Sequence, residues 1–131
     1  MNTLVRQLTS SSITSTADDI AHLDVPRSGF IIAVVWACRF DFGADNDAID
    51  LELSFASASQ ITTNDPNSVI DGVSIGYGIT GAAGSDLQGI NRVLSGIMIP
   101  VRTNDRLYLH CIESGSVTGR VRCLIHIGGA K

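Results

Sequence analysis

One long apolar segment, Gly29–Phe42, restricts the fold of this chain more than any other feature. Its even-numbered positions from Ile32 onward are all apolar, whereas its odd-numbered positions begin apolar and end with Arg39 and Asp41. Side chains of a β-strand alternate between two faces, so one face of this segment lies on a hydrophobic core throughout. We therefore predict a central strand whose second face is covered only along its first half.

Other segments alternate in the same way and are separated by Gly, Asn, Asp and Ser, with no helical periodicity. In Ile49–Phe55 the odd positions are apolar, and we expect Asp50, Glu52 and Ser54 to face solvent. Further strands are predicted at Ile20–Val25, Val69–Tyr77, Leu94–Val101, Leu107–Ile112 and Val121–Ile127. The pattern predicts an all-β fold, a single-domain antiparallel β-sandwich that is jelly-roll-like, with an immunoglobulin-like sandwich as the alternative.

The chain of 131 residues has the length of one domain. We interpret residues 1–19, which are rich in Ser and Thr, as an N-terminal arm or edge strand, and residues 20–131 as the sandwich. Such an arm can become ordered on a neighbouring molecule. The glycine-bearing stretch from Tyr77 to Gly89 is predicted to be a functional loop.

Composition indicates which partners the chain has. Charged residues make up 17% of the chain, below the roughly 25% of typical soluble domains, so we expect part of the surface to be covered in a homo-oligomer. The net charge of −4 argues against sequence-independent nucleic-acid binding, which needs a basic surface. The sequence shows no secretory signal and no apolar run of about 18 residues, so we predict synthesis in a cytoplasm and no membrane partner.

No arrangement of nucleophile and base is visible, so we predict that the chain is not an enzyme and has no cofactor. Cys38, Cys111 and Cys123 lie in apolar segments and are expected to be buried thiols. A bridge between Cys111 and Cys123 across a hairpin is the alternative. His110 and His126 are interpreted as partly exposed strand histidines; the alternative is that they are neighbours across the same hairpin, which would allow a metal or a pH-sensitive contact.

The acidic stretch around Asp45, Asp47 and Asp50 offers oxygen ligands for Ca²⁺. An EF-hand loop needs glycine where Asp50 stands, so a polar turn is favoured and no metal site is predicted. Whether Ca²⁺ binds there is left open by the sequence.

Two kinds of side chain are candidates for contacting a partner. Arg102, Arg106, Arg120 and Arg122 are predicted to form a basic strip on one sheet that meets acidic groups of a partner or of a second copy. Tyr77 and Tyr108 are the aromatic residues expected to be exposed, and in a carbohydrate-binding module they would stack on sugars.

Residues 104–111, Asn-Asp-Arg-Leu-Tyr-Leu-His-Cys, are followed by a Gly/Ser turn and the closing segment 120–127. This region resembles the terminal hairpin of small jelly-roll structural proteins of tailed bacteriophages, such as capsid decoration (cement) proteins and fibre-tip modules. The resemblance implies a homotrimer located in the virion, at symmetry axes of the capsid.

The expected function is therefore that of a virion structural protein, a decoration or cement protein that binds the outside of a capsid and stabilises it. Its expected partners are further copies of itself and the capsid protein. A phage fibre tip or carbohydrate-binding β-sandwich module is the alternative. The residues expected to contact partners are Val5, Leu8, Ile13, Tyr77, Ile79, Arg102, Arg106, Arg120 and Arg122.

Overall fold

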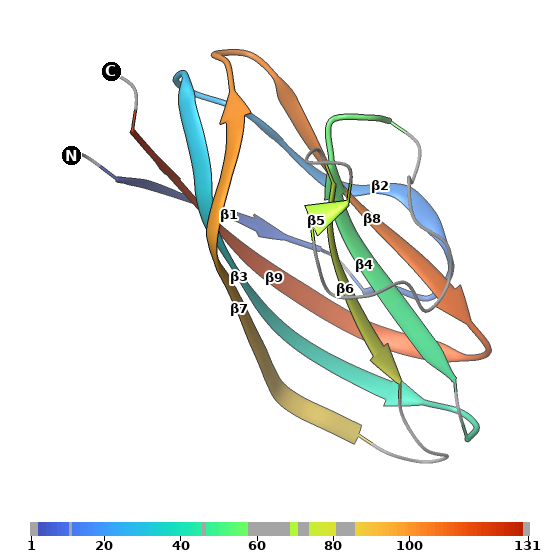
Figure 1. The fold of residues 1–131 in the computed structure, drawn as a ribbon. Coiled ribbons are helices and arrows are strands. Elements are labelled where there is room, and N and C mark those ends of the chain that lie inside the picture. Colours follow the sequence, from blue (N-terminus) through green and yellow to red (C-terminus); the bar gives the residue numbers. More distant parts are fainter. Residues whose placement is uncertain are drawn as a thin grey trace.

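The computed structural model describes residues 3–10, 12–45, 47–57, 69–70, 74–80 and 86–129. These residues form strands and their connections (Figure 1), and the central strand predicted from the sequence is confirmed with the same bounds. No helix in the described part of the chain is long and apolar enough to cross a membrane. The strands are β1 (Leu4–Thr9), β2 (Ala17–Asp24), β3 (Gly29–Phe42), β4 (Ala48–Ser54), β5 (Val69–Ile70), β6 (Ser74–Thr80), β7 (Asp86–Val101), β8 (Arg106–Ser114) and β9 (Val117–Gly128).

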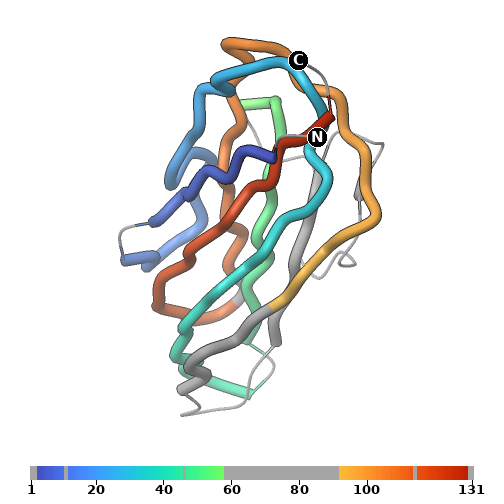
Figure 2. Tube along the Cα trace, turned by 90° about the vertical axis from the view of Figure 1, so that its left-hand side faces the viewer, coloured from blue at the N-terminus to red at the C-terminus, as the bar shows by residue number. Residues whose placement is uncertain are grey.

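The strands form two antiparallel sheets, with the orders β1-β9-β3-β7 and β2-β8-β4-β6-β5. Figure 2 shows the four-stranded sheet in front. Apart from the two-residue β5, the chain pairs from its two ends inwards, as β1 with β9, β2 with β8, β3 with β7 and β4 with β6. This long ribbon is rolled so that β9 also pairs with β3, and β8 with β4. The topology is that of a jelly roll, so the predicted fold class is confirmed.

The hydrophobic core lies between the two sheets. In β3 the even-numbered residues from Val34 to Phe42 are all buried, and Trp36 and Phe40 are 0% exposed. The opposing sheet contributes Leu51, Leu53, Leu107 and Leu109 to the same core. Alternation therefore fixes the inward face from Val34 onward. The prediction of one core face along the whole segment is wrong at its start, because the register shifts between Ile31 and Ala33 and it is Ile31, not Ile32, that is buried.

The outer face of β4 is buried, contrary to the prediction that it faces solvent. Asp50, Glu52 and Ser54 alternate with core residues as expected, but each is at most 1% exposed. Because β4 is a central strand, β8 and β6 flank it on both sides, and Glu52 lies opposite His110 of β8. The chain after the strand also bends towards this face, since the Ser54 hydroxyl donates a hydrogen bond to the Ala56 carbonyl at 3.1 Å.

The predicted hairpin between the last two strands is wrong. Only residues 115–116 separate β8 from β9, yet β8 belongs to the five-stranded sheet and β9 to the four-stranded sheet. Cys111 and Cys123 are therefore not cross-strand partners, and neither are His110 and His126. All three cysteines are free and buried.

The N-terminal strand contributes to the core of its own domain. β1 pairs with β9 along its whole length and forms one edge of its sheet. The side chains of Leu8 and Ile13 are 5% and 3% exposed. Ile13 also exchanges two backbone hydrogen bonds with Gly119, of 2.7 and 3.1 Å. That residues 1–19 also contact a neighbouring molecule stays a prediction.

The middle of the chain is more regular than the sequence suggested. The strand predicted at Val69–Tyr77 is in fact two strands, β5 and β6, and the second continues to Thr80. Since β7 begins at Asp86, the predicted loop from Tyr77 to Gly89 is wrong at both of its ends. The part of it at 81–85, like the predicted turn at 62–68, lies outside the described residues.

Candidate binding surfaces

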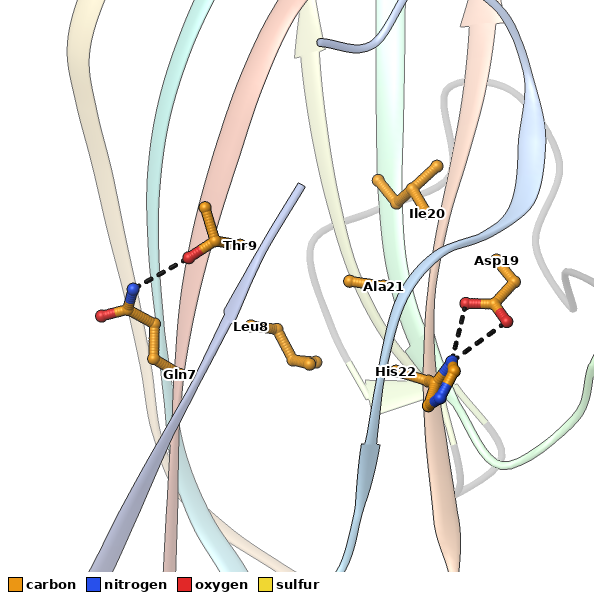
Figure 3. Close-up of a pocket in the computed structure, with 7 residues that line it drawn as sticks. All are labelled: Gln7, Leu8, Thr9, Asp19, Ile20, Ala21 and His22. Carbon is orange, nitrogen blue, oxygen red and sulfur yellow. Dashed lines mark hydrogen bonds and ion pairs between the residues drawn. The ribbon is translucent and has the colours of Figure 1, made fainter. Parts of the chain in front are cut away.

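A hollow of about 530 Å³ lies between the edge strands of the two sheets, β1 and β2 (Figure 3). Its polar groups are paired with each other. Gln7 Nε2 donates a hydrogen bond to Thr9 Oγ1 at 2.8 Å, and His22 Nδ1 lies 3.2 Å from Asp19 Oδ2. Within the described residues β1 pairs only with β9, and β2 only with β8. An extended segment of a partner can add to an unpaired strand edge of this kind.

The exposed large apolar side chains of the described residues lie on the four-stranded sheet. Among the described residues, the large hydrophobic side chains that are exposed are those of Val5 (43%), Val93 (61%) and Met98 (68%). They lie on β1 and β7, the two edge strands of this sheet. Met98 lies next to a bulge, where Gly96 adopts a φ of 72° and the register of β7 against β3 shifts. Bulges of this type redirect side chains at a sheet edge.

A partly apolar row runs across the outer face of this sheet from Val93 on β7 through Val35 and Leu124 to the polar Gln7 on β1. Val35 of β3 pairs with Leu124 of β9 on one side and with Val93 of β7 on the other. Val35 and Leu124 are half-buried, whereas Arg39 and Asp41, further along β3, are exposed. The sequence prediction that the second face of β3 changes from apolar to polar is thereby confirmed.

A basic cleft lies on the same outer face, at the end where β3 and β9 approach their turns. Arg39 of β3 is directly opposite Arg120 of β9, and Arg122 is opposite Ala37. All three arginines are exposed. Two neighbouring hollows of about 580 and 300 Å³ share Arg39 and Arg120 in their walls, and Arg122 lines the smaller one. We call this surface, defined by Arg39, Arg120 and Arg122, the basic cleft.

The four arginines predicted to form one strip are divided between two ends of the sandwich. Arg102 follows β7 near the start of β3, because Val101 pairs with Gly29. Arg39 lies ten residues further along β3, or about 33 Å at the rise of a strand. Arg106 belongs to the other sheet, where its Nε donates to Asp24 Oδ1 at 2.9 Å and lowers the pKa of that carboxyl. The single strip is therefore wrong, and only Arg120 and Arg122 lie together.

Sequence reasoning missed Arg39 as a member of this surface. Its outward position was visible in the alternation of Gly29–Phe42, but its place beside Arg120 depends on the pairing of β3 with β9. Those strands are far apart in the chain, and no local signal specifies their register.

The remaining predicted contact residues have different environments. Val5 is exposed on the outer face of β1, whereas Leu8 and Ile13 point into the core. Tyr77 and Ile79 belong to β6, where they pair with Leu51 and Ile49. The side chains of Tyr77 and Ile79 lie outside the part of the chain that the structure describes.

A buried polar network on the outer face of the five-stranded sheet was also missed. His110 Nε2 lies 2.9 Å from Ser54 Oγ and 3.0 Å from the Ala56 carbonyl. Its Nδ1 lies 4.0 Å from Asp18 Oδ1. A serine hydroxyl, a histidine and an aspartate follow one another in the same order in a catalytic triad. However, Ser54 and His110 are 1% and 0% exposed, and the Ser54 hydroxyl donates to the Ala56 carbonyl. Burial keeps substrates away from the hydroxyl, so we interpret the network as structural.

Tyr108 is not an open platform for a sugar ring. It is half-buried, and its ring centroid lies 6.2 Å from that of His22 and 6.1 Å from that of His110. A ring held between two others presents less of its faces to a ligand.

The acidic turn before β4 is organised by one buried carboxylate. Asp47 Oδ2 accepts hydrogen bonds from the backbone N–H groups of Ala44 at 2.8 Å and Ser116 at 3.0 Å. It thereby ties the β3–β4 turn to the β8–β9 turn. Among the described residues no group of three or more His, Cys, Asp or Glu side chains is placed to hold a metal ion.

The cysteines are as inaccessible as the sequence predicted. Burial raises the pKa of the Cys38 thiol to about 12 and raises the pKa of Cys111 and Cys123 as well. Thiols with such pKa values remain protonated at neutral pH and are poor nucleophiles.

No family model and no curated protein matches the chain. Solved structures with a similar arrangement of strands include a decameric BFDV capsid protein, with 12% identity, coverage of 96% of this chain and 98% of that one, and a TM-score of 0.41. A structure of infectious bursal disease virus, Gt strain, has 14% identity over 97% of this chain and 33% of that one, with a TM-score of 0.38. A pilus protein of Bacillus endospore appendages has 11% identity over 99% and 93%, with a TM-score of 0.34. All three TM-scores are below 0.5, so these likenesses carry no information about function.

Proposed function

We propose that the chain is a structural protein of a virus particle, a decoration or cement protein that binds the outside of a capsid as a homo-oligomer and stabilises it. The observation that carries the proposal is the location of Val5, Val93 and Met98 on one sheet. Apolar side chains gathered on a sheet face and its edges are typical of surfaces that another protein covers. The buried nucleophiles described above agree with a structural role.

The virion location and the trimer are expectations from the sequence resemblance of residues 104–127 to phage decoration proteins, although these residues do not form the hairpin that the resemblance implied. In a trimer, three weak contacts with the capsid combine through their effective concentration. Because Leu8 and Ile13 lie in the core, Val5 is the residue of the N-terminal arm that we expect to touch a partner.

Sedimentation with capsid shells of the virus that encodes the chain tests this function. The protein is expected to sediment with the shells and to raise their disruption temperature. A Val93→Asp/Met98→Asp double variant is expected to lose most of both effects, because it places charges in the apolar surface. Thr103→Asp, an exposed change in the turn before β8, is the matched control. Shells whose stability is unchanged by saturating protein would refute the cement function.

A further inference from the structure

The basic cleft brings three exposed arginines together on one face of the four-stranded sheet. Arg39 and Arg120 are directly opposite each other on β3 and β9, and like charges in such a pair destabilise a sheet. Arg122 follows on the same face of β9. We propose that this cleft binds an acidic, extended peptide segment of a partner protein, whose carboxylates lie between the arginines.

Among the described residues, the charge of the cleft is only partly balanced. Arg39 already has an interaction partner, so the proposal depends on the other two arginines. In the described part of the chain, no carboxylate forms an ion pair with Arg120 or Arg122. Asp41 lines the larger hollow and is the acidic residue in its wall. On a chain with a net charge of −4, this local positive surface is complementary to an acidic partner.

The shape and lining of the cleft fit a peptide. The two hollows are neighbours that share Arg39 and Arg120 in their walls, and their lining residues follow one another along β3 and β9. Hydroxyl side chains complete the lining and can donate to or accept from the backbone of a bound segment. These are Thr9, Ser12, Thr14 and Thr118.

The same lining disfavours a nucleic acid. None of the residues that line the two hollows is aromatic, whereas proteins that bind single strands usually stack bases on aromatic rings. Asp41 would repel an unbroken row of phosphates, while a peptide can place its carboxylates beside Arg120 and Arg122 alone. The planar guanidinium group also matches a carboxylate with two parallel hydrogen bonds.

This inference goes beyond the proposed function and does not require a virion. The basic cleft and the bulge beside Met98 lie at different ends of the outer face, but Arg122 is two residues from Leu124 on the same face of β9, so the two surfaces adjoin there. Substitutions at Arg120 and Arg122 and substitutions at Val93 and Met98 therefore test them one at a time. Loss of peptide binding would leave the oligomer intact, and a monomeric protein would still offer the cleft.

Fluorescence anisotropy with the full chain tests the proposal. The probe is a labelled peptide of alternating Glu and Gly, compared with a Lys/Gly peptide of equal length and an oligothymidylate of equal charge. We expect the acidic peptide to bind most tightly and to weaken as salt rises. Arg120→Gln/Arg122→Gln is expected to lower its affinity at least about tenfold, and Arg120→Lys/Arg122→Lys to retain part of it.

Arg102→Gln is the matched control, because Arg102 is an exposed arginine at the other end of the sandwich. It is expected to leave peptide affinity unchanged. Melting temperatures and light-scattering masses show whether each variant keeps its fold and assembly. The proposal is overturned if the acidic peptide does not bind at low salt, if the Gln double variant binds it as well as the unaltered protein, or if oligothymidylate binds more tightly.

Discussion

At the scale of single residues, burial decides which polar groups can act on other molecules. Ser54 and His110 are hydrogen-bonded to each other, but both are buried, so we interpret the pair as stabilising the fold. The Cys38 thiol is likewise enclosed, and its pKa is raised to about 12. Arg120 and Arg122 are exposed and lie together, so they are available to a partner.

The Ser54–His110 pair should contribute measurably to stability. Ser54→Ala removes the hydroxyl that contacts both His110 Nε2 and the Ala56 carbonyl, and it is expected to lower the free energy of unfolding by about 1–2 kcal/mol. His110→Ala also leaves a cavity and is expected to cost more, about 2–4 kcal/mol. Urea unfolding measures both. His22→Ala, at an exposed histidine, is the control and should stay within about 0.5 kcal/mol of the unaltered protein. Equal losses for His22→Ala and His110→Ala would contradict the structural role.

Cys38 should make stability depend on alkaline pH. The folded pKa is about 12 and the ordinary value is 9.0, so the unfolded chain loses this proton first as pH rises. The contribution is complete below pH 9 and is lost between about pH 9 and 12. By about pH 10.5 the loss of folding free energy from this group amounts to about 2 kcal/mol. We expect unfolding free energy to fall less steeply from pH 8 to 10.5 in Cys38→Ala than in the unaltered protein. Parallel pH profiles would show that Cys38 ionises equally in both states.

At the scale of elements, each edge strand of the four-stranded sheet packs apolar side chains on the core and also exposes an apolar side chain on its outer face. β1 turns Leu8 into the core and Val5 outwards, so one short strand both closes the sandwich and offers a surface. β7 combines an exposed Val93 with the bulge at Gly96. Bulges and exposed edges are where sheets control their pairing with other chains.

Two substitutions separate the inner and outer roles of β1. Leu8→Ala removes a buried side chain and is expected to lower the free energy of unfolding by about 2–5 kcal/mol. Val5→Ala is expected to leave stability within about 0.5 kcal/mol, since Val5 is 43% exposed. Chemical denaturation at low protein concentration measures both. A small effect of Leu8→Ala would mean that β1 is not docked on its own domain in solution.

The sequence predicts the features that arise within one strand, but it does not predict those that depend on pairing between distant strands. Alternation within Gly29–Phe42 was enough to give a strand with its true bounds. Alternation in β4 found the inner Leu51 and Leu53 but not the burial of Glu52, whose cross-strand neighbour His110 of β8 is more than fifty residues away in the chain. The short β8–β9 connection resembled a hairpin, since turn residues do not reveal that a chain changes sheets. Arg39 escaped notice for the same reason, as the register of β3 and β9 is non-local.

At the scale of the whole molecule, the jelly roll presents two candidate binding surfaces on its four-stranded sheet, one partly apolar and one basic. Its two sheets enclose one core, and the exposed apolar side chains of the described residues lie on the four-stranded sheet. The row that includes Val35 and Leu124 crosses that sheet and meets β1 at Gln7, and the basic cleft begins two residues further along β3 and β9, at Ala37 and Arg122. We expect copies of the chain to associate through the first surface and an acidic partner to bind the second.

The mass of the protein in solution, measured by light scattering across a range of concentrations, tests the central claim most directly. The account predicts a stable homo-oligomer, with a trimer as the expected number of copies. It further predicts that Val93→Asp/Met98→Asp shifts the mass to that of the monomer while Thr103→Asp does not. A monomer at every concentration, or a double variant with the mass of the unaltered protein, would contradict assembly through the four-stranded sheet.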